Sequence, residues 1–361
     1  PRLSGRSLAP TFGVKERTVK KIFEKGGPHK IKKTGADEFS LTISIPADAD
    51  GRMARECSNA ECSPGYFKVM PGTGITEGHE LAYCPYCRRE GVPNDFTTKE
   101  QIRFAKDTVT REAHRGIDAM FREALGVGSS GKKKMGGGLV SLGLSYKSAA
   151  LPHVRRPFED EIRRDVVCPV CTLDQTVFGL ATWCSDCGND IFMTHVSSEL
   201  GVTRLMVGDI TRRQELLGSR VAGKDLENCL EDAVSIFEAS IKALVRRALV
   251  ERDEGRDSVE ARFKKIGNSF QSIERTKERL IELFSFDIGN SEIFPKLSAA
   301  FEKRHPVTHN LGVVDRKYME KTQQSEKEGR EVRISVHEVE SLLSMVEDAV
   351  GHIYAGIVQK S

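Results

Sequence analysis

The chain has 361 residues, of which 39% are hydrophobic and 30% charged, and its formal net charge at pH 7 is +3. It is long enough for two or three globular domains with apolar cores. It contains no run of about eighteen apolar residues, and residues 1–10 lack the apolar stretch of a secretory signal. These features exclude a transmembrane helix and predict a soluble, cytoplasmic protein with no membrane partner.

The first segment, residues 1–38, is strongly basic. Its first 35 residues contain ten Lys or Arg and only two Glu. Basic side chains near a nucleic-acid backbone release counterions, so one interpretation is an arm that contacts phosphates. Charged termini also occur as flexible, solubilising tails, and this second interpretation stays open.

Residues 39–125 predict a small β module followed by a long helix. Phe39–Ile45 alternates apolar and polar residues and stops at Pro46, which is typical of a short strand. Between Thr97 and Leu125 there is no proline, and apolar residues recur with helical spacing. We expect this helix to begin with Thr98 as its N-cap.

Residues 126–150 predict a linker, because Gly126–Gly138 is rich in glycine and lysine and cannot bury an apolar face. A second small module, residues 151–198, follows it. Strands are expected in this module at Val166–Val170 and Thr176–Trp183.

Residues 199–361 predict helices only. The most regular pattern indicates a single helix from Val259 to Phe284, because its apolar residues alternate in steps of four and three. Amphipathic helices with narrow apolar faces are typical of an antiparallel bundle. The fold class is therefore α+β and multidomain, with two small β modules and a C-terminal all-α bundle. The expected helices are Leu226–Leu249, Val259–Phe284, Ile293–Phe301 and Val339–Ile357.

Eight of the nine cysteines form four close pairs. In a long intracellular protein such pairs bind metal more often than they form disulfides. One tight turn aims both sulfurs of a pair at one ion, and two turns complete the tetrahedral shell that Zn²⁺ prefers. We predict two structural Zn²⁺ ions, since four protein ligands leave no open position for water. The predicted ligands are Cys57, Cys62, Cys84 and Cys87 at one site and Cys168, Cys171, Cys184 and Cys187 at the other.

Both modules resemble zinc ribbons, over residues 40–90 and 160–190. A catalytic zinc would need one cysteine to be displaced, and a thioredoxin-type redox pair would leave the other cysteines unexplained, so both alternatives are weaker. His79 is a replacement ligand only if Cys57 or Cys62 does not bind.

Tyr66, Phe67 and Lys68 lie beside the first cysteine pair. They could stack on bases of a nucleic acid. A module this small has few other residues to bury, so we favour a role in its core.

The helical region contains the run Arg304-His305-Pro306-Val307-Thr308-His309. RNA cleavage without metal needs a group that moves protons at the 2′-hydroxyl or the 5′-oxygen, and a cation that stabilises the phosphate. Histidine titrates near neutral pH, and a guanidinium can engage two phosphate oxygens at once. An Arg-x4-His spacing is expected by chance in a chain of this composition. The spacing alone therefore does not identify an active site, and the surrounding sequence must decide whether one is present.

This run, together with Asn310–Asp315 after it, resembles the signature of the HEPN superfamily of helical domains, many of which are RNases. The resemblance covers residues 200–361. It implies a homodimer in which two copies of the motif meet in one cleft and cut RNA without metal, leaving 2′,3′-cyclic phosphate and 5′-hydroxyl ends. It assigns Arg304 to phosphate stabilisation, His309 to general acid or base catalysis, and His305 to orientation or substrate contact.

Two alternatives concern the motif itself. Arg330 and His337 fit a longer spacing of the same signature, but they lie in a polar connecting stretch and match less well. Arg304 could also form an internal ion pair while His309 satisfies a helix end, and the bundle would then have no active site.

Three functions follow from these patterns. The first is a metal-independent endoribonuclease effector of the bacterial antiphage or toxin type, whose ribbons recognise or position a target. The second is a non-catalytic nucleic-acid-binding protein that dimerises through an inactive bundle. The third is a scaffold whose ribbons bind protein. Cleavage of RNA would indicate the first function. Salt-dependent binding without cleavage would indicate the second, and no affinity for nucleic acid would indicate the third.

Overall fold

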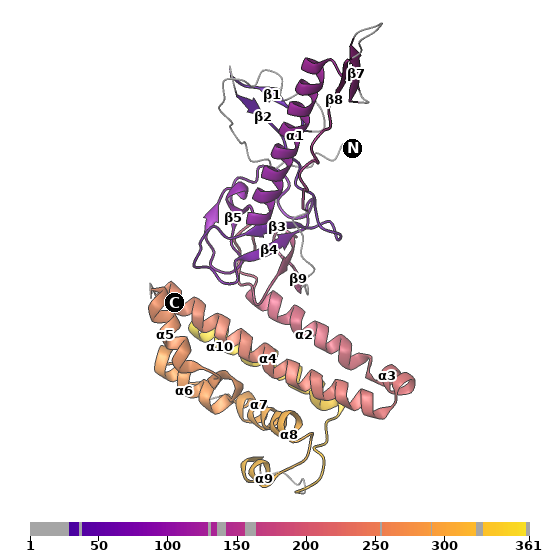
Figure 1. Ribbon diagram of the computed structural model, residues 1–361. Helices are drawn as coiled ribbons and strands as arrows, with labels where there is room; N and C mark the ends of the chain where they lie inside the picture. The colour runs from indigo at the N-terminus through magenta and orange to yellow at the C-terminus, as the bar shows by residue number, and fades with distance from the viewer. Residues whose placement is uncertain are drawn as a thin grey trace.

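The computed structural model describes residues 29–35, 38–128, 131–135, 142–155, 164–252, 255–289, 291–322 and 328–358. Most of the basic segment predicted at residues 1–38 therefore lies outside the described residues. The described chain forms two parts (Figure 1). We call the residues up to Ile191 the N-terminal half and Phe192–Val358 the helical half.

A four-stranded antiparallel sheet with the order β3-β4-β10-β9 organises the N-terminal half. The inner strands pair with Gln175 opposite Val69 and Val177 opposite Phe67. The sequence predicts the two cysteine modules as separate domains, whereas in the structure each contributes one hairpin to a shared sheet. The strands are β3 (Met53–Glu56), β4 (Tyr66–Val69), β9 (Arg164–Val167) and β10 (Asp174–Val177).

The helix α1 (Lys99–Leu125) rises from this sheet (Figure 1). The Thr98 side chain accepts a hydrogen bond from the Gln101 N–H, and the Gln101 side chain accepts one from the Thr98 N–H. This reciprocal capping box confirms the predicted N-cap. The remaining short elements are β1 (Lys32–Lys33), β2 (Phe39–Ser40), β5 (Ala82–Tyr83), β6 (Glu90–Gly91) and the 3₁₀ helix η1 (Pro93–Phe96).

Several expected elements of the N-terminal half differ from the observed ones. The strand predicted at Phe39–Ile45 is limited to β2. Within the predicted linker, β7 (Lys132–Met135) and β8 (Leu142–Ser145) form an antiparallel hairpin at the end of α1 (Figure 1). The strand predicted at Thr176–Trp183 ends at Val177.

The helical half is built on three long helices, α2, α4 and α10, which pack against one another (Figure 1). Their apolar faces, with those of the shorter helices, form one continuous core. The helices are α2 (Phe192–Gly208), α3 (Ile210–Leu217), α4 (Ser219–Glu251), α5 (Arg256–Ile266), η2 (Ser269–Gln271), α6 (Ile273–Phe284), α7 (Ile293–Glu302), α8 (Arg304–His309), α9 (Arg316–Thr322) and α10 (Val336–Ile357).

The single helix predicted from Val259 to Phe284 is wrong. Gly267 ends α5 with φ 50° and ψ −121°, a conformation that L side chains rarely adopt. A new helix begins where the Ser272 side chain accepts a hydrogen bond from the Arg275 N–H. Glycine and a capping serine therefore divide an apolar pattern that is regular on both sides of them.

The two halves are joined at α2. The boundary predicted between residues 198 and 199 lies inside this helix. Ile191 belongs to the apolar cluster of the N-terminal half, whereas Phe192 belongs to the core of the helical half.

Side chains reinforce this joint. The guanidinium carbon of Arg247 in α4 lies 4.0 Å from the ring centroid of Trp183, and Arg247 pairs with Asp190. The Tyr354 hydroxyl of α10 donates to Asp190 at 2.8 Å. Among the described residues, no helix is long and apolar enough to cross a membrane.

Candidate functional site

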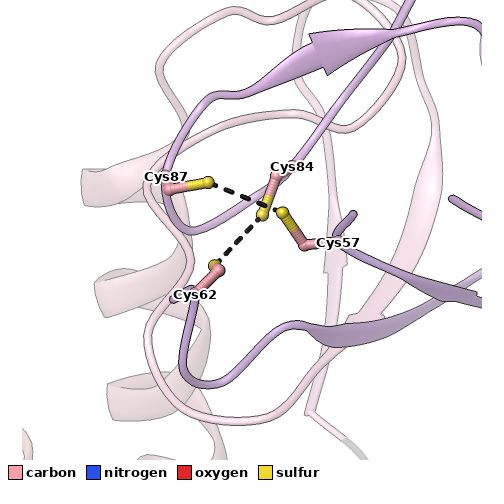
Figure 2. A group of neighbouring side chains, drawn as sticks. All are labelled: Cys57, Cys62, Cys84 and Cys87. Atoms are coloured by element: carbon pink, nitrogen blue, oxygen red, sulfur yellow. Dashed lines mark hydrogen bonds between the residues drawn. The ribbon is translucent and has the colours of Figure 1, made fainter. Parts of the chain in front are cut away.

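The first cysteine cluster unites Cys57, Cys62, Cys84 and Cys87, whose sulfurs point toward one another (Figure 2). Cys57 Sγ and Cys87 Sγ lie 3.7 Å apart, and Cys62 Sγ and Cys84 Sγ lie 3.6 Å apart. A tetrahedral zinc site with Zn–S bonds of about 2.3 Å has sulfurs about 3.8 Å apart, whereas a disulfide brings them to about 2.0 Å. The distances fit metal ligands and exclude disulfides.

The second cluster unites Cys168, Cys171, Cys184 and Cys187. Its sulfur distances are 3.7 Å between Cys168 and Cys187 and 3.4 Å between Cys171 and Cys184. In each cluster the four sulfurs lie within 4.8 Å of one another. Each cluster can hold one zinc ion, and all eight predicted ligands belong to one of them.

Three of the four cysteine turns share one backbone geometry. The residue after the second cysteine is left-handed, with φ 59° at Arg88, 63° at Thr172 and 66° at Gly188. Each of these three N–H groups donates to the carbonyl of the first cysteine of its pair at 3.0 Å. The turn between Cys57 and Cys62 differs because four residues separate its cysteines.

The turn between Cys84 and Cys87 and the turn between Cys184 and Cys187 face each other through matching hydrogen bonds. The Tyr83 N–H donates to the Ser185 carbonyl at 2.8 Å, and the Trp183 N–H donates to the Pro85 carbonyl at 3.1 Å. Tyr83 and Trp183 each precede the first cysteine of a pair, and Pro85 and Ser185 each follow it. The two modules are thus related by an approximate twofold axis, and β4 and β10 are neighbours across it.

The thiols of each cluster shift one another's pKa values. Hydrogen bonds from the thiols of Cys57 and Cys62 lower the pKa of Cys87, whereas the hydrogen bond with Cys57 raises the pKa of Cys62. In the second cluster burial raises the pKa of Cys171 to about 12. Four sulfurs this close cannot all ionise without a cation among them, and a divalent ion supplies that compensation.

Neighbouring side chains keep to structural roles. His79 Nε2 lies 3.2 Å from the backbone oxygen of Asp186 in the second module, so His79 is not part of the first cluster. Phe67 and Lys68 are buried, and Lys68 pairs with Asp48 at 3.2 Å. This burial favours the predicted core role of these two residues over stacking on bases.

The helical half brings Arg304, His305 and His309 together on α8. This short helix begins after Lys303, because Pro306 has no N–H to donate to the carbonyl four residues earlier. Pro306 and Val307 are buried and hold α8 on the bundle, whereas His309 is exposed and His305 is partly exposed. The two imidazole rings lie 5.1 Å apart, centroid to centroid.

A chain of polar contacts orients Arg304. Its Nη1 donates to Gln271 Oε1 at 3.2 Å, and Gln271 Nε2 donates to Glu238 Oε2 at 2.8 Å. Glu238 also pairs with Lys242 at 2.6 Å. The Nε of Arg304 is buried and has no hydrogen-bond partner in the described part of the chain. Among the described residues, Arg304 is therefore held by a neutral amide and not by a carboxylate.

The loop after α8 is fixed as well. Asn310 Nδ2 donates to Asp315 Oδ2 at 2.8 Å, and the Asn310 N–H donates to the Pro306 carbonyl at 2.9 Å. Of the competing pair, His337 lies exposed in the first turn of α10 and Arg330 lies in the bend before it.

Gln271 and Glu238 were missed by the sequence analysis. Gln271 lies in η2, inside the stretch that we predicted as one helix, and no motif marks it. Gln271 and Arg304 are 33 residues apart in the sequence, and their contact arises because the helix α5 ends at Gly267. Only the three-dimensional arrangement identifies it.

No protein-family model, curated protein or solved structure matches this chain. Its function must therefore be argued from its own side chains. Within the described part of the chain, the candidate sites are the two cysteine clusters and the Arg304–His309 face of α8.

Proposed function

We propose that this protein is a metal-independent endoribonuclease whose active site is the exposed face of α8, as a HEPN-type domain would place it. In this proposal each cysteine cluster holds one Zn²⁺, which stabilises the N-terminal half and takes no part in catalysis. The substrate is RNA, and the active form is a homodimer in which two α8 faces share one cleft.

The observation that supports catalysis is the pairing of two imidazoles on the short helix that begins with Arg304. His305 and His309 are four residues apart on α8, and their ring centroids are 5.1 Å apart. Residues at this spacing lie on one face of a helix. Arg304 precedes them, with Gln271 as its partner for one terminal N–H. An amide partner leaves the positive charge of Arg304 uncompensated, as phosphate binding requires.

The proposed reaction is an intramolecular transesterification at the phosphate. The 2′-oxygen attacks phosphorus as its proton passes to a base, and the bond to the 5′-oxygen breaks as that oxygen receives a proton. His309 serves as general acid or base, His305 contacts the substrate, and Arg304 stabilises the phosphate. The products carry a 2′,3′-cyclic phosphate and a 5′-hydroxyl.

The cysteine clusters are poor candidates for catalysis. All four sulfurs of each cluster converge, which leaves no position for water on a tetrahedral ion. No other group of three or more His, Cys, Asp or Glu gathers in a metal-binding arrangement among the described residues. The proposed chemistry therefore depends on α8 alone.

The test compares the wild-type chain, His309→Ala and Arg304→Lys on an end-labelled RNA in EDTA. Zinc content is measured in the same samples, so that loss of Mg²⁺ is separated from loss of zinc. We expect cyclic-phosphate ends from the wild type and about a 10²–10⁴-fold lower rate for His309→Ala, the usual loss when a general acid or base is removed. Arg304→Lys keeps the charge but loses bidentate contact, so we expect a lower rate there too.

His114→Ala is the matched control, because His114 is an exposed histidine on α1. It should cut at the wild-type rate. Equal cleavage by the wild type and His309→Ala would contradict the proposal, and loss in His337→Ala alone would move the site to the competing motif. Salt-dependent RNA binding without cleavage would favour the non-catalytic function.

A further inference from the structure

A pocket lies between α2 and α4, two helices that pack against each other (Figure 1). Its volume is about 410 Å³, within the range of about 300–1,000 Å³ that is usual for small-molecule sites. Residues of the N-terminal half also line it. Ligand sites occur preferentially between the helices of bundles and at the junctions of domains, and this pocket lies at both.

Each helix gives the pocket one face. On both helices the lining residues follow the spacing i, i+3, i+4 and i+7, from Glu199 to Met206 on α2 and from Asp232 to Ala239 on α4. Side chains at this spacing share one face of a helix. From the N-terminal half, Leu180 reaches the pocket from the loop after β10. The pocket thus unites segments that are far apart in the sequence.

Part of the pocket wall is apolar. Val202 and Met206 are 56% and 41% exposed, although both side chains are large and apolar. Leu180 and Ile236 are partly buried and pack against the core of the helical half. A ligand with an apolar body would remove this surface from water, which favours binding. The wall therefore suits a ligand that is largely apolar.

The two carboxylates that line the pocket differ in their partners. Arg164 Nε donates to Glu199 Oε2 at 3.2 Å, so the charge of Glu199 is compensated. Asp232 has no hydrogen bond or ion pair with any described residue. Burial raises the pKa of Asp232, and the charge of Glu231 raises it further. The uncompensated charge in this part of the pocket wall is therefore a carboxylate.

Glu199 is approached from a second side by His195, one turn earlier on α2. His195 is fully buried, and its Nδ1 accepts from the Ala181 N–H at 2.9 Å, so the ring proton lies on Nε2. Nε2 has no hydrogen-bond partner in the described part of the chain and lies 3.7 Å from Glu199 Oε1. Glu199 thus has Arg164 and a buried N–H beside it, which leaves Asp232 to meet the charge of a ligand.

We propose that this pocket binds a small organic monocation, a primary amine on an apolar body, with its ammonium on Asp232 and its body against Leu180, Val202 and Met206. An anion would be repelled by Asp232, and a neutral apolar ligand would desolvate that carboxylate without giving it a partner. A bound amine would contact both halves of the molecule and stabilise their junction. The inference does not rest on the proposed function, since none of the described lining residues belongs to α8.

Tryptamine is the probe, because it carries one ammonium on an apolar ring system. Isothermal titration calorimetry with the full chain at pH 7 should give a Kd between about 10 µM and 1 mM, as expected for a ligand of this size. The matched ligand is 3-indolepropionate, which has the same ring and a carboxylate in place of the ammonium. It should bind at least about tenfold more weakly, because its charge has the same sign as that of Asp232.

Two variants test the site from different directions. Asp232→Asn keeps the size of the side chain and removes its charge, so tryptamine should bind about 5- to 100-fold more weakly, the usual loss for a hydrogen bond to a charged group. Ala239→Phe places a large ring in the pocket and should weaken tryptamine binding at least about tenfold. The matched controls are Asp257→Asn and Ala261→Phe, at exposed positions of α5, and both should bind as the wild type does.

Circular dichroism and zinc content establish that each variant is folded. Equal affinity of the wild type and Asp232→Asn for tryptamine would overturn the proposal. So would equal affinity of the wild type for the two ligands, or no binding of tryptamine up to about 10 mM, well above the expected range. His309→Ala should bind tryptamine as the wild type does, so a failure of the RNA assay and a failure of amine binding are separate results.

Discussion

The two halves of this molecule obtain their stability in different ways. The apolar cluster of the N-terminal half is small and includes cysteines of both clusters, whereas the helical half has a continuous core that runs from Phe192 to Ile357. A small module cannot bury enough apolar surface to fold alone and needs a further constraint, which a metal supplies. The difference teaches that the cysteine clusters supply to the N-terminal half a constraint that the helical half obtains from its apolar core.

The largest expected effect comes from removing one cysteine of a cluster, which should unfold the N-terminal half and leave the helical half folded. Structural zinc contributes about 10–16 kcal/mol in isolated zinc-finger peptides, as much as the whole stability of a typical domain. We expect Cys184→Ala to lose the fold of the N-terminal half while α4 and α10 keep theirs. Zinc content should fall from about two ions per chain to below one, because β4 loses its partner β10.

Limited proteolysis and metal analysis measure this outcome. Cys229→Ala is the matched control, since Cys229 is buried in the helical core and belongs to neither cluster. It should keep both ions. If Cys184→Ala kept one full equivalent of zinc, the two modules would be independent in spite of their shared sheet.

The second prediction tests the helical core. Phe237 is fully buried in α4, and its ring meets Phe301 edge to face at 5.3 Å. Phe237→Ala should lower the free energy of unfolding by about 3–5 kcal/mol, the usual cost of replacing a buried aromatic side chain with alanine. Thermal unfolding measures it, with zinc content unchanged. Leu205→Ala is the control, because Leu205 is 77% exposed and should change stability by less than about 0.5 kcal/mol.

Local features of the sequence were predicted well. The eight cysteines predicted as zinc ligands lie in two groups of four because the close spacing within each pair is a short-range property, and the helix that begins after Thr98 carries its own capping signal. The last helix was found because its apolar stripe is uninterrupted from Val339 to Ile357. Each of these depends on residues close together in the chain.

The errors have long-range or backbone causes. The pairing of β4 with β10 joins strands about a hundred residues apart, and no local pattern encodes it. The break at Gly267 was missed because the apolar stripe continues on both sides. For α8, the sequence named Arg304 and the histidines but could not show that Gln271 holds the arginine.

The third prediction concerns the joint between the halves. Arg247 lies against Trp183 and pairs with Asp190, and its side chain is 11% exposed. Burial lowers the pKa of Arg247, but its pairing with Asp190 and Glu251 outweighs this and raises it overall. Arg247→Ala should cost about 2 kcal/mol and separate unfolding into two transitions, because a partly buried ion pair and a cation–π contact are lost.

Differential scanning calorimetry would resolve the two transitions. Arg246→Ala is the neighbouring control, since Arg246 is 44% exposed and pairs with the exposed Glu260. It should change stability by less than about 1 kcal/mol. A single unchanged transition in Arg247→Ala would mean that continuity of the chain at α2 suffices to couple the halves.

The smallest expected effect is pH-dependent and concerns the docking of α2 on α10. Glu347 accepts hydrogen bonds from Ser197 and from Arg204, the latter at 2.6 Å. Burial alone would raise the pKa of Glu347, but these two partners lower it below 4.5 overall. The ionised carboxylate thus favours the folded state above pH 4.5, and this contribution disappears as the pH falls through the folded-state pKa.

Glu347→Gln should therefore reduce stability by about 0.5–1 kcal/mol at pH 7, since the side chain is 31% exposed. Below pH 4.5 the variant and the wild type should converge. Urea unfolding at each pH gives the difference, and any loss of zinc in acid affects both proteins equally. Glu340→Gln, an exposed position on the same helix, should show no such trend. A constant difference at every pH would mean that Glu347 acts through its shape and hydrogen bonds, and that its charge does not hold α2 against the bundle.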